Sequence, residues 1–126
     1  ISLFASANFV AGQVLTGGAS QAFLQGGGSP ANNTPIKVAI GYATNDVAVT
    51  AAGGAPATDT VATIPTGLNQ LSIGSFVGFS LLNGHVREIA YFNTRLPNAQ
   101  LEALTAPSLA LPLDLNFVTP SYTVGY

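Results

Sequence analysis

Large and small residues alternate along the segment 36–42, IKVAIGY, which predicts a half-buried β-strand. One face of this strand would carry the large residues Ile36, Val38, Ile40 and Tyr42. The opposite face would carry Lys37, Ala39 and Gly41. Because a strand buries one face, the large residues are expected to point into a core.

The residues that follow predict further strands separated by tight turns. After a turn at 43–45, the segment DVAVT places Val47 and Val49 on one face, and Gly53 and Gly54 then suit the positive φ of a hairpin turn. A third strand is expected at 59–64 and a fourth at 69–74, with Leu71 and Ile73 inward. This order predicts an antiparallel meander.

The N-terminal third also fits short strands. The segments 1–10, 13–17 and 20–25 are each compatible with a strand, with Gly17 and Gly18 at the turn between the last two. The stretch 26–35, GGGSPANNTP, is a loop by composition. The whole pattern therefore favours an all-β fold.

The segment 83–106 concentrates the charged residues. In GHVREIAYF, a β-bulge at Arg87-Glu88 would turn these two residues outward and Val86, Ile89 and Tyr91 inward, because a bulge resets the alternation. The spacing then becomes helical. Pro97 suits the first helical position, an apolar stripe follows, and Pro107 stops the helix. The stripe consists of Leu96, Leu101 and Leu104. We therefore expect one short helix near residues 97–105.

The composition indicates a protein that works inside an assembly. Only 6% of the residues are charged, whereas ordinary globular domains have about 25%. With 48% hydrophobic residues, the folded chain is expected to expose uncharged patches that mark a partner surface. With only three Lys and Arg residues, the chain lacks the cluster of positive charge that binding to nucleic acid or to an anionic membrane surface requires. No run of about 18 apolar residues occurs, which excludes a transmembrane helix.

Three segments resemble, in the same order, the concanavalin A-like (laminin-G-like) jelly-roll domains of bacteriophage tail and fibre proteins. They are KVAIGYATNDVAVTAAGGAPATDT, PTGLNQLSIG and LNGHVREIAYFNTRLPNAQLEALTA. The match covers residues 36–106. It implies an antiparallel jelly-roll or β-sandwich domain over residues 1–106. Because residues 1–35 match less clearly and leave little chain upstream, a truncated version of the fold is expected.

Under this resemblance the charged segment is a structural seam formed by Arg87, Glu88 and Arg95. Arg95 would anchor the link between the last strand and the helix by bonding helix-end or loop carbonyls. Glu102 would lie on the outer helix face.

No catalytic, cofactor-binding or metal-binding residues are expected, and the chain is not expected to be an enzyme. Glycosidases need two carboxylates that face one cleft, and Glu88 and Glu102 belong to a bulge and a helix. One histidine, His85, and no cysteine give no basis for a zinc site or a nucleophilic triad. The pair Asn45-Asp46 is the one candidate position for binding calcium, although Asn and Asp are also common residues in turns.

Four residues are candidate glycan or interface contacts, and the interface interpretation is favoured because aromatic residues are enriched at interfaces. They are Tyr42, Phe76, Phe79 and His85.

Residues 107–126 form a second region, predicted as an extended, proline-rich arm. Pro107, Pro112 and Pro120 prevent a continuous helix, and the composition is too apolar for a solvated tail. The arm would add a strand to a neighbouring subunit or complete its own sheet. Its proposed contact residues are Leu113, Leu115, Phe117 and Tyr122.

The sequence therefore favours a structural protein of a bacteriophage virion, assembled in the host cytoplasm. A fibre, tail or capsid-decorating component that forms homo-oligomers and binds other virion proteins fits these features. The alternative is a carbohydrate-binding module that attaches the particle to a host surface glycan. Because the chain begins at Ile1 and has no methionine, we expect a processed product or a piece of a longer protein.

Overall fold

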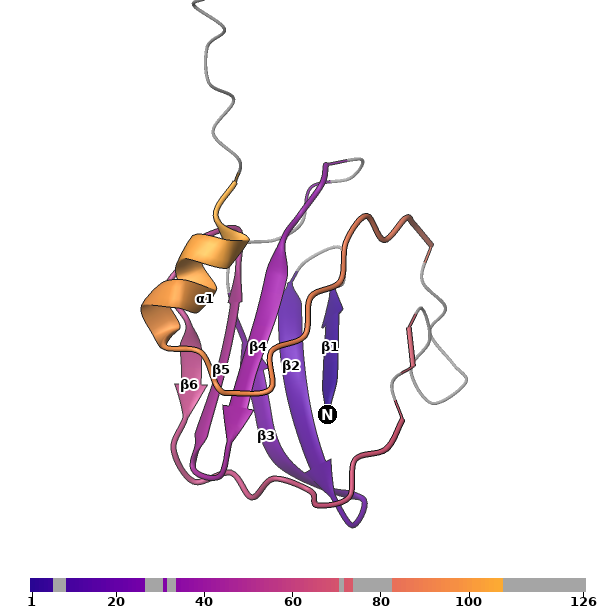
Figure 1. Cartoon of the computed structure of the whole chain (residues 1–126), viewed down its shortest axis with the longest axis vertical. Coiled ribbons are helices and arrows are strands. Elements are labelled where there is room, and N and C mark those ends of the chain that lie inside the picture. The colour runs from indigo at the N-terminus through magenta and orange to yellow at the C-terminus, as the bar shows by residue number, and fades with distance from the viewer. Residues whose placement is uncertain (6–8, 27–30, 32–33, 71, 74–82, 108–126) are drawn as a thin grey trace, which may run out of the picture.

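The computed structural model describes residues 1–5, 9–26, 31, 34–70, 72–73 and 83–107. This part of the chain forms two antiparallel three-stranded sheets and one short helix (Figure 1). The first sheet contains β1 (Ser2–Ala5), β2 (Val10–Thr16) and β3 (Ala19–Gln25). The second sheet contains β4 (Val38–Ala43), β5 (Asp46–Ala51) and β6 (Ala57–Asp59). The helix α1 spans Asn98–Thr105.

Tight turns follow β2, β4 and β5, as the sequence predicts. Gly17 and Gly18, with φ angles of 58° and 82°, connect β2 to β3. Asn45 has a φ of 57° between β4 and β5, and Ala52 and Gly53 have φ angles of 51° and 72° after β5. The turn after β5 therefore uses Ala52 and Gly53 rather than the expected pair of glycines, so an alanine occupies a backbone region that favours glycine.

The two sheets pack against each other through β2 and β5 and form the core between them. Val14 of β2 and Val47 of β5 belong to one buried cluster, and Val10 and Val49 belong to a second. Ile40 and Tyr42 pack against the first cluster, as the alternation of β4 predicts. At Gly12 the sheets approach so closely that an added Cβ would clash with Val49 Cγ2.

The helix α1 adds a third layer on the outer face of the second sheet (Figure 1). Its Leu101 and Thr105 are buried. Gly41 on β4 lets this layer approach, since a Cβ there would lie 2.9 Å from Arg95 Cδ and 3.0 Å from Leu101 Cδ1. The small residues on this face of β4 therefore make room for the helix and its preceding arginine.

Three sequence predictions about this region need correction. The helix begins at Asn98, and Pro97 is its N-cap residue with a ψ of 150° rather than its first helical residue. Leu104, expected in the apolar stripe, is 47% exposed. The third strand ends at Asp59, so the predicted strand over 59–64 is wrong for most of its length.

The predicted strands later in the chain are also wrong for the residues that the structure describes. Ile73 is exposed outside any strand, and no strand occurs in 83–92. Val86, Ile89 and Tyr91, expected to point inward, are all exposed. The physical reason is that a strand needs a hydrogen-bonded neighbour, and none of the described strands pairs with 83–92.

The coarse expectation of a mainly β protein is confirmed. Every described strand pairs only with its neighbour in sequence, so both sheets are meanders. A jelly roll would also need pairs between strands distant in sequence. No helix among the described residues is long and apolar enough to cross a membrane.

Candidate functional site

Arg95 links the start of α1 to the first residue of β5. One guanidinium nitrogen, Nη2, donates to Asp46 Oδ1 at 2.8 Å and to Asn98 Oδ1 at 2.6 Å, and Nη1 donates to the carbonyl of Leu96. The arginine side chain is 11% exposed and that of Asp46 is 57% exposed. The buried Nε has no hydrogen-bond partner in the described part of the chain. The predicted role of Arg95 as an anchor between a last strand and the helix stays a prediction; the contacts observed are the Leu96 carbonyl, Asn98 and Asp46.

The other end of α1 is held against the turn after β5. The backbone N–H of Gly53 donates to Thr105 Oγ1 at 3.2 Å, and that hydroxyl donates to the carbonyl of Leu101 at 3.0 Å. Thr105 is buried, so these bonds satisfy a polar group that water does not reach. Together with Arg95, they fix both ends of a helix that has no side-chain cap at its N-terminus.

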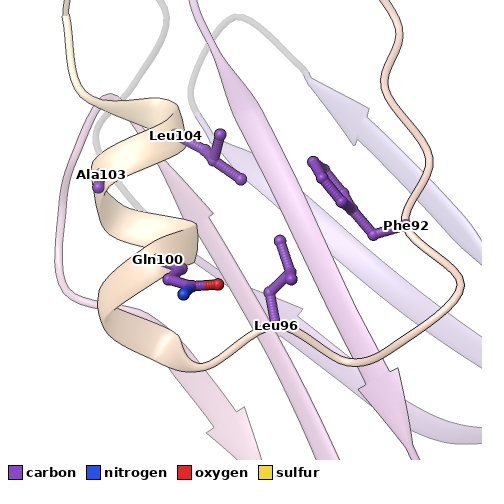
Figure 2. Close-up of a pocket in the computed structure, with 5 residues that line it drawn as sticks. All are labelled: Phe92, Leu96, Gln100, Ala103 and Leu104. Carbon is purple, nitrogen blue, oxygen red and sulfur yellow. The ribbon is translucent and has the colours of Figure 1, made fainter.

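Between α1 and the segment that precedes it lies a shallow apolar groove of about 330 Å³. Figure 2 shows Phe92, Leu96 and Leu104 pointing toward one another in front of β4. Gln100 and Ala103 of α1 complete the lining. The groove contains no charged residue, and both Phe92 and Leu104 are about half exposed. It therefore suits one or two apolar side chains of a partner.

A broader, open hollow lies between β1, β4 and the exposed segment 83–94. Tyr42 and Tyr91 both line it. Burial, followed by the interaction with the neighbouring Tyr91, raises the pKa of Tyr42 above its ordinary value. Side chains that can form hydrogen bonds also line the hollow, namely Asn69, Gln70, Asn83 and His85. Aromatic rings and amides are thus present in one concave region.

The described structure does not bring together the residues that were considered for calcium binding or for catalysis. Among the described residues there is no group of three or more His, Asp or Glu that could hold a metal. The carboxylate of Asp46, the calcium candidate, bonds to Arg95. Glu88 lines the hollow, whereas Glu102 on α1 is not among its described lining residues.

The other predicted site residues fall into two groups. Tyr42 and His85 both line the hollow, and Arg87 and Glu88 are exposed together with the rest of the segment 83–92, which is not a strand. The remaining candidates lie outside the described residues. They are Phe76, Phe79, Leu113, Leu115, Phe117 and Tyr122.

Sequence reasoning missed the apolar groove and the roles of Asp46 and Thr105. The groove had a partial signal, because Leu96 and Leu104 were recognised as apolar helix positions but were assigned to the interior. No local signal in the sequence indicated the contact between Asp46 and Arg95, because the two residues lie 49 positions apart in the chain.

Comparisons with family models, with curated proteins and with solved structures gave no match to this chain. The resemblance to bacteriophage domains therefore stays a prediction from its motifs.

Proposed function

We propose that this protein is a structural component of a bacteriophage particle and acts by assembling with copies of itself and with other particle proteins. The observation that carries this proposal is the set of large apolar side chains exposed on residues 68–104. They are Leu68, Ile73, Val86, Ile89, Tyr91, Phe92 and Leu104. Outside this part of the described chain, only Phe23 and Val61 are large, apolar and exposed.

Exposed apolar surface favours association because burying it removes it from water. The chain carries few charges that would keep such a surface solvated, since only 6% of its residues are charged. A surface of this kind is typical of a permanent interface rather than of a freely soluble monomer. The low charge and the exposed apolar residues thus support the same mode of action.

The motif resemblance over residues 36–106 supports the attribution to a bacteriophage fibre, tail or capsid-decorating protein. The same proposal includes a jelly-roll sandwich as the complete fold. Non-enzymatic assembly within the virion follows from this proposal.

Native mass spectrometry, followed by the intact mass of the denatured chain, tests the proposal. We expect a native species whose mass is a multiple of the denatured chain's mass. If the denatured mass exceeds the 12.7 kDa of this sequence, the chain is a module of a longer protein and the multiple is calculated from the larger mass. A stable monomer at the micromolar concentrations of the experiment would contradict the proposal.

A carbohydrate-binding function is the second candidate, and the hollow beside Tyr42 and Tyr91 favours it. Flat aromatic rings stack on sugars, and amide side chains bond their hydroxyl groups. Tyr91 is 77% exposed and so is accessible to a ligand. Saturable calorimetric binding of a neutral glycan that Tyr91→Ala abolishes and Tyr91→Phe retains would support this function. Equal binding by both variants would exclude this site.

A further inference from the structure

We propose that the apolar groove between Phe92 and α1 binds the C-terminal arm, residues 108–126, of a second copy of this chain. The proposal rests on the proposed assembly function and identifies the contact that drives it. It commits to one occupant, the arm of another copy, and to one binding place, the groove.

The chemistry of the groove suits this arm. Its lining is apolar apart from Gln100 and carries no charge. The arm, in turn, has Asp114 as its single charged residue and leucine at every second position from 109 to 115. In an extended chain such positions share one face, so successive leucines can enter one groove. A charged peptide would instead leave an unpaired charge against apolar side chains.

The geometry at the end of α1 favours a second copy over the arm of the same chain. Ala106, the C-cap residue, has φ and ψ angles of −53° and 139°, which belong to extended backbone. Pro107 follows and restricts Ala106 to this region. The turn after β5 also lies against the exit, because a Cβ on Gly53 would be 3.0 Å from Ala106 Cα. Ala106 and Pro107 therefore make no turn that would direct the chain back along α1, on whose side its own groove lies.

Cross-linking between two full-length variants tests the occupant. The chain contains no cysteine, so each engineered thiol is unique. One chain carries Gln100→Cys at the groove, and an isotopically heavy chain carries Asn116→Cys in the arm. The two are mixed under denaturing conditions, refolded together and treated with a short bismaleimide. We expect a linked dimer of one light and one heavy chain, identified by mass.

The matched control replaces Gln100→Cys by Gln25→Cys, an exposed glutamine on β3. Equal yields of the mixed dimer from the two positions would overturn the proposal. A chain carrying both Gln100→Cys and Asn116→Cys tests whether the groove binds the arm of its own chain instead. An intramolecular link at monomer mass would show that the arm binds its own groove and would also overturn it.

A second pair of variants measures the contribution of the groove to assembly. Phe92 in the groove and Phe23 on β3 are both 48% exposed, so Phe92→Ala and Phe23→Ala remove equal side chains of equal exposure. We expect Phe92→Ala to weaken association about tenfold and Phe23→Ala to leave it unchanged. Equal effects would contradict a specific role of the groove.

The native mass separates the two proposals. An oligomer without the specific cross-link would overturn arm binding and leave the assembly function standing. A monomer in native mass spectrometry would contradict the assembly function itself.

Discussion

At the scale of single residues, Arg95 joins three polar partners from different parts of the fold. Its planar guanidinium bonds the carbonyl of Leu96, the amide of Asn98 at the helix start and the carboxylate of Asp46 at the start of β5. A lysine ammonium has the same charge but cannot reproduce this fork of donors. The shape of the guanidinium, rather than its charge alone, is therefore the important property at this position.

We predict that Arg95→Lys lowers the free energy of unfolding by about 1–3 kcal/mol, because it breaks hydrogen bonds of a largely buried group. Urea unfolding followed by circular dichroism measures this change. Arg87→Lys is the matched control, since Arg87 is exposed, and its effect should stay within about 0.5 kcal/mol. Equal losses in the two variants would show that the contacts of Arg95 do not stabilise the fold.

Tyr42 gives a prediction about alkaline pH. Its pKa is raised in the folded protein, so folding favours the neutral phenol and the folded state holds this proton more tightly than the unfolded state. The stabilisation is complete below the ordinary tyrosine pKa of about 10 and is lost as the pH rises through the higher folded value. Urea unfolding at pH 9 and at higher pH should therefore show falling stability, with a smaller fall in Tyr42→Phe. An identical loss of stability with pH in the original protein and in Tyr42→Phe would contradict a contribution of the Tyr42 phenol.

At the scale of secondary-structure elements, the packing of α1 on the second sheet depends on Thr105. Its hydroxyl accepts the N–H of Gly53 and donates within the helix, and it does so in a buried position. Valine has nearly the same shape but leaves that N–H without its partner. The contact thus joins the last turn of the helix to the turn after β5.

We predict that Thr105→Val lowers the free energy of unfolding by about 1–2 kcal/mol, the cost of an unpaired buried donor. The same substitution at Thr58, which is exposed on β6, should have little effect. Amide hydrogen exchange provides a second measurement, because the Gly53 N–H should lose protection in Thr105→Val. Unchanged protection at Gly53 would show that this hydrogen bond is not formed in solution.

Local signals account for the elements that the sequence predicted correctly. Alternation in 36–42 and the turn residues near Asn45 and Gly53 act within a few residues, and they indicated β4, β5 and the turns around them. The segment 83–92 is not a strand, because its local alternation does not supply the hydrogen-bonded neighbour that a strand needs and none of the described strands pairs with it. The same limit applies to the site, because the carbonyl bond of Arg95 is local whereas its pair with Asp46 is not.

At the scale of the whole molecule, the low charge sets the expected response of the assembly to salt. The chain has a formal net charge of −2 and 6% charged residues, so the proposed assembly is expected to depend on apolar burial rather than on ion pairs. Raising NaCl from roughly 0.05 to roughly 0.5 M screens exposed charges over a few ångströms. An interface of apolar side chains gains or loses little from this screening.

We therefore predict that the association constant, measured by sedimentation equilibrium, changes less than about threefold over this range of NaCl. Sulfate at equal ionic strength should strengthen association, because it favours the burial of apolar surface. Phe92→Ala should reduce the response to sulfate, since less apolar surface would be buried when two copies associate. A steep loss of association in NaCl would instead indicate that the few charges, including Arg87 and Glu88, hold the copies together, and would contradict an apolar interface.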